Sequence, residues 1–328
     1  MGKFILRRLG ISAVILLVVT FILYLLMRSL PTSYVQTMAL QLSQAPGAKP
    51  YEQWVQQLNA QYGLDTGLLE GYLIQLRNLL TGNFGDSWKY TVPVLQKFRQ
   101  VVGISFTISA IALVLELLIA IPLGVIAAKH QYSHLDYALT TGALLGISLP
   151  AFFFATLLKL VFSVELGWFD LNGLFSRNFN NLTPLGQFLD VAKHLVLPIA
   201  TLVFISIGSL MRHTRTNMLE VLQADYIRTA RAKGVAERRV VYGHALRNCL
   251  IPLVTVVGGS LPGLFGGALI TETLFAIPGI GYTSYQAMVA GDIPFSMFYL
   301  TFMAVLILLG NLLSDIAYAL VDPRVRLS

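Results

Sequence analysis

The chain has 328 residues, of which 55% are hydrophobic and only 12% are charged. Soluble globular proteins carry about 25% charged residues, so this composition, with a mean hydropathy of +0.69, excludes that class and indicates an integral membrane protein. The formal net charge is +7, but the lysines and arginines lie mainly at the ends of apolar segments, and we therefore predict no nucleic-acid partner. The single cysteine, Cys249, excludes an internal disulfide and a multi-cysteine metal site.

The amino-terminal segment is basic and continues directly into an apolar run. This run is longer than the roughly 7 to 15 apolar residues of a cleavable signal peptide, and no clear small-residue cleavage site follows it. We therefore predict an uncleaved first membrane span.

Six segments are long and apolar enough to cross a bilayer, which takes about 20 residues in a helix. They cover residues 9–30, 101–128, 137–164, 194–210, 250–275 and 298–320. The fourth is the shortest. Basic residues before the first span, after the second and after the fourth fall on one side of six spans, which the positive-inside rule assigns to the cytoplasm. The sequence predicts an all-helical protein with both termini in the cytoplasm, and Arg324 and Arg326 agree with that orientation.

The segment between the first two spans, residues 31–100, is placed outside the membrane and is too long for a simple turn. Residues 51–62 and 68–80 have helical character, and Gly63 and Gly67 lie between them, so we expect a small ordered cap there. We divide the chain into residues 1–100, with the first span and the cap, and residues 101–328, with five spans.

Prolines and glycines interrupt the middle spans, at Pro122, Gly124, Gly146, Pro150 and Pro198. Inside a membrane, the backbone carbonyl that a proline frees is tolerated where neighbouring helices or a water-lined cavity satisfy it. The pattern fits a helical bundle with an aqueous path, although ordinary kinking explains each position equally well.

The fifth span carries a face of small residues. Gly259, Gly263 and Gly267 are spaced four apart, and Pro262 makes the same region bendable, so we expect another helix to approach closely there. Interrupted apolar segments also mark the pathways of transporters, whereas tight packing against a neighbour is the alternative. Our candidates for lining or gating a path are Pro150, Gly259, Pro262, Gly263, Gly267 and Glu272.

Residues 211–248 form the most charged part of the chain. The first half has helical periodicity, and the apolar face of that helix carries Leu219, Leu222, Tyr226 and Ala230. We expect Gly234 to end this helix and a second short helix to cover residues 236–248. Two amphipathic helices joined by a glycine can dock a soluble protein, and a basic loop that only lies on anionic lipid is the alternative.

The sequence DYIRTARAKG with a later HALRN resembles the cytoplasmic EAA loop of the membrane subunits of type I ABC importers. Only Ala230, Gly234 and Leu246 match the general family pattern outright. Other positions depart from it as they do in the branch that imports oligopeptides, dipeptides and nickel, namely Arg228, Thr229, His244 and Arg247. In the family this loop inserts into a groove of the ATPase subunit. The resemblance thus implies an ATPase-coupling loop over residues 225–246, formed by Asp225, Tyr226, Arg228, Thr229, Ala230, Arg231, Ala232, Lys233, Gly234, His244 and Leu246.

Further segments resemble the same branch. They are the outer motifs at residues 63–65 and 92–94, the sequence ETLFAIPGIG at 272–281, the GDIP motif at 291–294 and the carboxyl-terminal motifs at 315–318 and 322–324. Asn83 and Phe84 replace the usual Asp-Leu of the outer segment, so no function is carried over to that site. The resemblance covers nearly the whole chain and implies the type I ABC importer transmembrane fold.

Four ionisable residues lie within or near the predicted spans, namely Glu116, Lys159, Glu272 and Asp315. A charged group at mid-membrane costs at least about 2.5 to 3.5 kcal/mol, so such residues normally face a cavity or a partner. A proton-coupled secondary carrier that uses Glu116, Lys159 and Asp315 is the alternative function, but it leaves the charged loop unexplained.

The sequence lacks a phosphate-binding loop, a His-Glu-x-x-His motif and a Gly-x-Ser-x-Gly motif, and its histidines show no convincing metal spacing. We therefore predict no catalytic residue, no metal site and no cofactor in this chain. The resemblance implies a permease subunit that forms half of the path of a peptide importer in a prokaryotic cell membrane. Its implied partners are a second homologous permease, two ATPase subunits that bind ATP and Mg, an extracytoplasmic binding protein and the lipid bilayer. The same branch also carries nickel, glutathione, haem and sugars.

Overall fold

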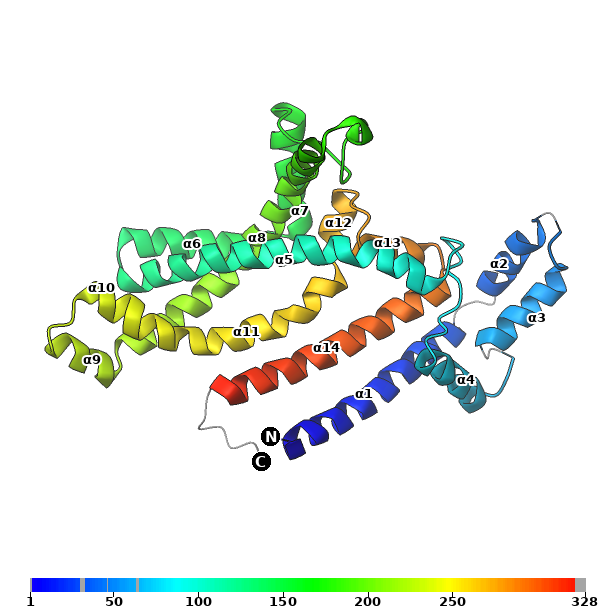
Figure 1. Ribbon diagram of the computed structural model, residues 1–328, viewed down its shortest axis with the longest axis horizontal. Helices are drawn as coiled ribbons and strands as arrows, with labels where there is room; N and C mark the ends of the chain where they lie inside the picture. The colour runs from blue at the N-terminus through cyan, green and yellow to red at the C-terminus, as the bar shows by residue number, and fades with distance from the viewer. Residues whose placement is uncertain (1, 30–32, 46, 63–64, 322–328) are drawn as a thin grey trace. The chain divides into compact units, whose positions relative to one another are not determined.

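The computed structural model describes residues 2–29, 33–45, 47–62 and 65–321 (Figure 1). Over these residues the chain is helical and contains no strand, apart from an isolated bridge between Asp86 and Pro93. This confirms the predicted all-helical class. Several predicted features lie outside the described residues, namely Gly63, the motif at 322–324 and Arg326.

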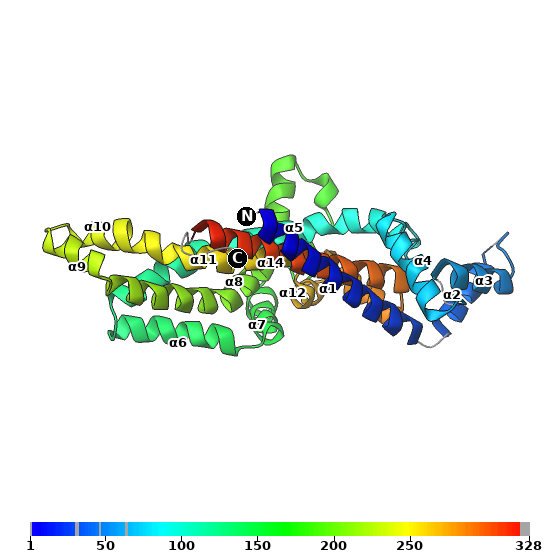
Figure 2. The ribbon, with the colours of Figure 1, turned by 90° about the horizontal axis from the view of Figure 1, so that it is seen from below.

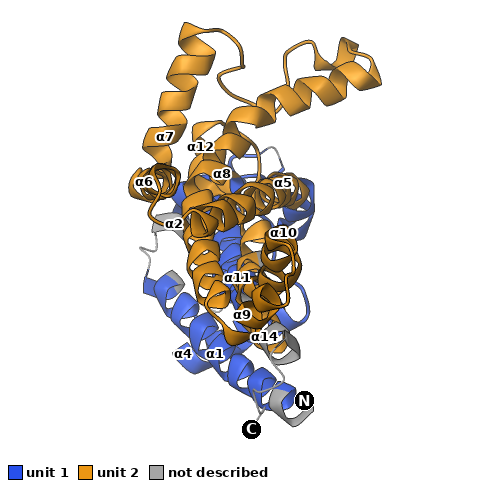
Figure 3. Ribbon diagram, turned by 90° about the vertical axis from the view of Figure 1, so that its left-hand side faces the viewer, with its two compact units in different colours: residues 1–100, 283–308 blue, residues 101–282, 309–328 orange. Residues whose placement is uncertain are grey.

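The described helices fall into two compact units, which Figure 3 shows in different colours. Unit 1 consists of residues 1–100 and 283–308, and unit 2 consists of residues 101–282 and 309–328.

Unit 1 begins with α1 (Gly2–Ser29), α2 (Ser33–Ser43), α3 (Tyr51–Tyr62) and α4 (Leu68–Leu80). Helices α3 and α4 confirm the two helices predicted between the first spans. They belong to one apolar cluster of unit 1, whose buried residues are Tyr24, Val35, Met38, Ala39, Leu58 and Ile293.

Unit 1 also contains most of α13 (Ile280–Val289) and the first part of α14 (Ile293–Val321). Asp292, at the start of α14, is buried and accepts hydrogen bonds from the Ser87 hydroxyl, from the Lys89 backbone N–H at 3.1 Å and from the Phe295 backbone N–H at 3.1 Å. The aspartate of the GDIP motif therefore joins the outer loop before α5 to the start of α14.

Unit 2 holds most of α5 (Val94–Lys129) and all of α6 (His134–Ser148), α7 (Ala151–Leu158) and α8 (Pro184–Leu222). A π-helix, η1 (Lys159–Glu165), continues α7, and a short 3-10 helix, η2 (Phe179–Asn181), precedes α8. Unit 2 also contains α9 (Asp225–Ala232), α10 (Glu237–Arg239), α11 (Leu246–Gly266) and α12 (Leu269–Leu274), with a second π-helix, η3 (Val240–Ala245), between α10 and α11. The first residues of α13 and the last part of α14 belong to it as well.

Five of the described helices are long and apolar enough to cross a membrane, and a sixth span is present if α6 and the α7–η1 segment count as one. This agrees with the predicted number of spans. The two halves of the third predicted span meet at an angle of 103°, at the interruption that Gly146 and Pro150 mark in the sequence. Leu149 adopts an extended conformation there, with ψ at 128°, as the residue before a proline prefers.

The fourth span, predicted to be the shortest, lies in the longest helix that the structure describes, α8, with 39 residues. The predicted span was short because the apolar segment is bordered by polar residues, but α8 includes these residues as well. His194 is buried and its Nδ1 lies 2.8 Å from the Asp190 carbonyl oxygen, while Lys193 pairs with Asp170. Thr183 caps the start of the helix by accepting a hydrogen bond from the Gly186 N–H.

Glycines allow close helix packing in unit 2. A Cβ atom on Gly124 of α5 would lie 2.6 Å from the Thr214 side chain of α8, and one on Gly146 of α6 would lie 2.7 Å from the Phe204 carbonyl oxygen. A Cβ atom on Gly208 of α8 would collide with the Ala143 carbonyl oxygen of α6. Gly124 and Gly146, which the sequence marked as interruptions, therefore serve as contact points between helices.

Candidate functional site: the charged loop and a membrane cavity

The charged segment forms two helical arms at one end of unit 2, where α9 and α10 lie together in Figures 1 and 2. The predicted first helix is wrong in one respect. Helix α8 ends at Leu222, Ala224 is extended with ψ at 147°, and α9 begins at Asp225. A negative residue in the first turn of α9 suits the partial positive charge of a helix start.

This break changes which side chain of α9 faces inward. Leu219, Leu222 and Ala230 pack as predicted, but Tyr226 is 46% exposed, and its neighbour Ile227 is completely buried. The assignment of Tyr226 to the apolar face is therefore wrong. Starting the helical period afresh at Asp225 would have identified Ile227 and Ala230 as the inward positions, three residues apart.

Gly234 ends α9, as predicted, in a left-handed conformation with φ at +77°. The Gly234 N–H donates to the Arg231 carbonyl at 2.9 Å, and the Val235 N–H donates to the Ala230 carbonyl at 3.2 Å. These bonds close the helix end in the manner of a glycine cap, and a residue with a Cβ atom pays about 1 kcal/mol in this conformation.

The second arm is not the separate helix predicted over residues 236–248. It passes from α10 through η3 directly into α11, so the loop and the fifth span form a continuous helical segment. The arm therefore joins the fifth span without an intervening non-helical link.

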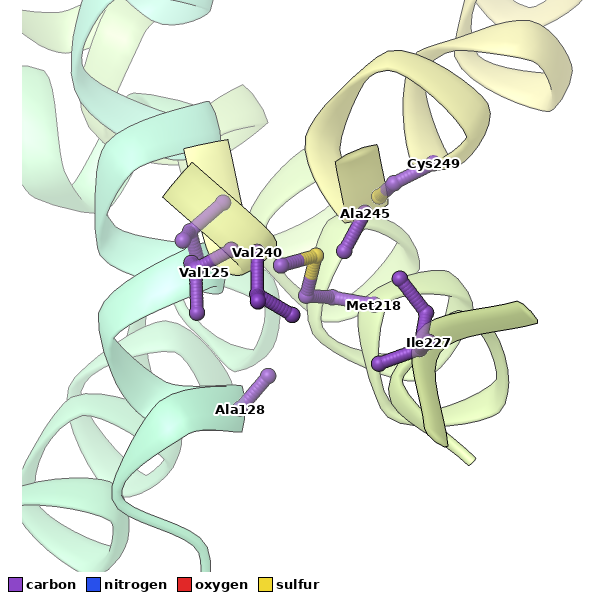
Figure 4. Packing of buried hydrophobic residues seen from close by; sticks show 8 residues of the cluster. Val125, Ala128, Met218, Ile227, Val240, Ala245 and Cys249 are labelled. Carbon is purple, nitrogen blue, oxygen red and sulfur yellow. The ribbon is translucent and has the colours of Figure 1, made fainter. Parts of the chain in front are cut away.

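Figure 4 shows the apolar cluster that holds both arms, which we call the loop core. It is formed by Val125, Ala128, Met218, Ile227, Val240, Val241, Ala245 and Cys249. These residues come from α5, α8, both arms of the loop and the start of α11. Complete burial of a medium-sized apolar side chain contributes about 1.5 to 3 kcal/mol, so the loop is firmly attached to the ends of α5 and α8.

The opposite surface of the loop, which we call the charged face, is open to solvent. Its exposed residues include Asp225, Tyr226, Arg228, Thr229, Arg231, Ala232, Lys233, Arg238, Arg239 and His244. Most of the residues predicted for coupling lie here, whereas Ala230 and Leu246 are half-buried beneath it. The sequence missed most of the buried members of the loop core. For those in the two arms, the signal was a period of apolar residues restarted in each arm.

An ion pair crosses the turn at Gly234. The Arg231 guanidinium donates from Nε to one Glu237 carboxylate oxygen at 3.1 Å and from a terminal nitrogen to the other at 2.8 Å. This hydrogen bonding raises the pKa of Arg231 further above its ordinary value. Exposed pairs contribute only about 0 to 1 kcal/mol, and this one is better suited to orient the two arms than to stabilise the fold.

A cavity of about 490 Å³ lies elsewhere in unit 2, between α5, α8 and the α11–α12 segment. Its wall includes Ser109, Glu116, Ser206, Ser260, Gly263, Gly267 and Thr271. Two of the predicted path residues, Gly263 and Gly267, thus line a cavity. Pro150 instead caps α7 at the bend of the third span.

Of the three glycines predicted to allow a close helix approach, Gly267 does so, because a Cβ atom there would lie 2.6 Å from the Gly281 backbone nitrogen at the start of α13. A Cβ atom on Gly259 or Gly263 would meet no described atom within 4 Å. The contact is made on another face of α11. Pro262 packs directly against Gly310 of α14, and a Cβ atom on Gly258 would lie 3.7 Å from the Ser314 backbone. Gly259 and Gly263 therefore border open space in the described chain, whereas Gly267 and Pro262 make close contacts.

Glu272 is completely buried and holds the segment after the fifth span in place. Its carboxylate accepts hydrogen bonds from the Ser105 hydroxyl at 2.7 Å, from the Ala268 N–H at 3.1 Å and from the Tyr282 N–H at 2.9 Å. The Ser105 oxygen in turn accepts from the Ile280 N–H at 2.7 Å. Glu272 is absent from the cavity wall, so its position gives it a structural role.

Lys159 is bound to the segment that follows α12. Its ammonium donates to the Leu274 carbonyl at 2.6 Å and to the Asn172 side chain at 2.8 Å, and it lies 5.4 Å from the centre of the Phe275 ring. These contacts connect η1 to the end of α12. None of them involves Glu116 or Asp315, the other two residues of the alternative proton relay.

Over residues 120–327 the chain matches the protein family described as binding-protein-dependent transport system inner membrane component. It is 36% identical to the oligopeptide transport system permease protein AppB of Bacillus subtilis, over 99% of this chain and 100% of that protein. It is 36% identical to the di/tripeptide transport system permease protein DppB of Pseudomonas aeruginosa and 34% identical to the dipeptide transport system permease protein DppB of Escherichia coli, in each case over 99% of both chains.

Proposed function

The chain belongs to the family of binding-protein-dependent transport system inner membrane components, and we propose that it forms half of the translocation path of a peptide ABC importer. The observation that carries this proposal is the construction of the charged loop. Its exposed basic face is available to a soluble partner, while its buried face is packed on α5 and α8 through the loop core.

The loop has the properties that force transmission requires. A partner that moves the charged face also moves Ile227 and Val240, which are completely buried against the ends of α5 and α8. The second arm continues into α11, which contributes to the cavity wall. Binding of ATP by the partner would thus be converted into a displacement of helices that border the path.

Relatives in ABC importer systems imply ATPase and binding-protein partners in general. The proposed complex has this chain, a second homologous permease, two ATPase subunits and one extracytoplasmic binding protein. ATP and Mg are bound by the ATPase subunits, and this chain contributes no catalytic residue. The charged loop and both termini face the cytoplasm of a prokaryotic cell, and residues 31–100 face outward.

The family assignment overturns the proton-coupled secondary carrier that the ionisable residues of the spans had suggested. The charged loop, which that alternative left unexplained, lies within the residues that match the family. Glu116 and Asp315 are not assigned to a proton relay.

Co-purification tests the proposed function. The tagged chain is isolated from its native membrane, the accompanying proteins are identified by mass spectrometry, and ATP hydrolysis by the complex is measured. A homologous permease and P-loop ATPases are expected to accompany the chain. A chain that purifies without an ATPase, from membranes in which peptide uptake is intact, would contradict the proposal.

A further inference from the structure

Glu116 is an ionisable residue in an otherwise uncharged cavity. Among the described residues that line the cavity, it alone carries a charge, and the rest of the wall is apolar, glycine or hydroxyl-bearing. It lies in α5, in the middle of a span, and is half-buried. A charge at such a depth is costly unless it faces water or a partner.

The protein satisfies this carboxylate only in part. Ser206, on α8, is the hydrogen-bonding side chain beside it. The Ser206 hydroxyl also lies 2.6 Å from the Leu202 carbonyl oxygen, and its single proton cannot be donated fully to both acceptors. The described residues of the cavity wall include no lysine, arginine or histidine that could pair with Glu116. The Glu116 carboxylate therefore keeps acceptor positions that a cation from outside the chain can occupy.

The volume and the other polar groups indicate the size and kind of ligand. Pockets that bind small molecules measure about 300 to 1,000 Å³, and this cavity, at about 490 Å³, falls within that range. The hydroxyls of Ser109 and Thr271 add donors and acceptors to the wall, and Gly263 leaves room on the α11 side. This combination suits a short flexible chain of amides with one positive end.

We infer that Glu116 contacts the cargo, and that its carboxylate binds the amino-terminal ammonium of a peptide as the peptide passes through the cavity. This inference rests on the proposed function as a peptide permease. The amino-terminal ammonium is present on linear peptides whatever their side chains. One carboxylate in the path therefore binds the ammonium group that all linear peptides share. A single contact of this kind is weak enough to release the peptide again.

The experiment uses the complete importer in proteoliposomes, supplied with saturating binding protein. ATP-dependent uptake is measured for a tripeptide with a free amino terminus and for the same tripeptide after N-acetylation. Glu116→Gln keeps the size of the side chain and removes its charge. It is expected to lower kcat/KM for the free tripeptide about tenfold, because one charge-assisted hydrogen bond is lost. Uptake of the acetylated tripeptide is expected to change less than twofold.

Two further variants provide controls. Glu116→Asp keeps the charge and is expected to retain uptake of the free tripeptide within about threefold. Glu165→Gln makes the same chemical change at an exposed position that does not line the cavity, and is expected to leave uptake unchanged. If the unaltered importer does not take up the acetylated tripeptide, the inference is tested by the difference in uptake of the free tripeptide between Glu116→Gln and Glu116→Asp.

Several results would overturn the inference. These are an equal fall for both tripeptides, no fall with Glu116→Gln, and an equal loss in Glu116→Gln and Glu116→Asp. Failure of the Glu116→Gln chain to retain the second permease during purification would show instead that the carboxylate binds that subunit. Absence of ATP-dependent uptake by the unaltered complex would contradict the proposed function itself, and is thereby distinguished from failure at Glu116.

Discussion

Asp136, at the start of α6, and Arg215, on α8, form a bidentate ion pair in which both N–O distances are 2.7 Å. The Asp136 side chain is only 4% exposed and the Arg215 side chain 22%. Asp136 also accepts hydrogen bonds from the Tyr132 N–H at 3.0 Å and from the Thr140 hydroxyl at 3.3 Å. The pair thus fixes the first turn of α6 to the part of α8 that leads to the charged loop.

Removal of one partner is expected to be costly, because it leaves the other charge buried and unpaired. We predict that Asp136→Ala lowers the free energy of unfolding by about 3 kcal/mol. Thermal unfolding of the purified chain in detergent measures this loss. Asp225→Ala is the control, because Asp225 and its partner Arg228 are 98% and 72% exposed, and its effect is expected to stay below about 0.5 kcal/mol. Equal stability of the two variants would contradict a structural role for the Asp136–Arg215 pair.

The sequence predicted those features of the fold that depend on local pattern. Helices α3 and α4 follow from their periodicity and from the glycines near their ends, and the left-handed turn at Gly234 follows from the need for a residue without Cβ. The number of spans follows from the lengths of the apolar segments. The coupling role proposed for the charged loop rests on its motif rather than on its periodicity.

Other features depend on contacts between distant residues, which no local pattern contains. Asp136 and Arg215 are separated by 79 positions. The start of α8 is helical although it is polar, and Lys193 and His194 there lie beside Asp170 of the preceding loop. The break before Asp225 contains neither glycine nor proline, and for this reason the inward side chain was assigned to Tyr226 instead of Ile227.

Two neighbouring residues of α9, Ile227 and Tyr226, allow packing in the loop core and docking on the ATPase to be tested separately. Ile227 is completely buried in the loop core, so Ile227→Ala is expected to lower the free energy of unfolding by about 2 to 5 kcal/mol. Tyr226 is 46% exposed on the charged face, and Tyr226→Ala is expected to change stability by less than about 0.5 kcal/mol while weakening association with the ATPase. Thermal unfolding and co-purification measure the two effects. The interpretation of α9 fails if Tyr226→Ala is the more destabilising change.

The turn at Gly234 is expected to be essential for coupling. Its φ of +77° is inaccessible to proline, so Gly234→Pro should displace the two arms of the loop and uncouple ATP hydrolysis from uptake while the chain remains in the membrane. Uptake in proteoliposomes and ATP hydrolysis by the same complex measure this. Gly243→Ala is the matched control, because a Cβ atom there would make an ordinary contact of 3.5 Å with Arg239. Normal uptake by Gly234→Pro would rule out the coupling role of the turn.

Reversal of the Arg231–Glu237 pair tests how the pair acts. Arg231→Glu places two carboxylates across the turn and is expected to reduce coupled uptake severalfold, because like charges repel where a bidentate pair held the arms. If the pair orients the arms, the double change Arg231→Glu with Glu237→Arg restores uptake. If Arg231 binds the ATPase directly, the double change stays defective and the complex loses ATPase during purification. Uptake by the single variant at the normal level would contradict both roles.

Two glycines of unit 2 are expected to differ in how a methyl group changes the stability of the chain. A Cβ atom on Gly208 would collide with the Ala143 carbonyl oxygen and meet the Ile147 side chain at 2.9 Å, so Gly208→Ala must push α6 away from α8. Overpacking of this kind costs about 1 to 3 kcal/mol, and the separation would also strain the neighbouring Asp136–Arg215 pair. Gly263→Ala adds the same methyl group to open space in the cavity wall, and its thermal unfolding is expected to match that of the unaltered chain. An equal loss of stability in the two variants would mean that another chain segment or subunit fills the space beside Gly263, and the cavity assigned to cargo would then be closed.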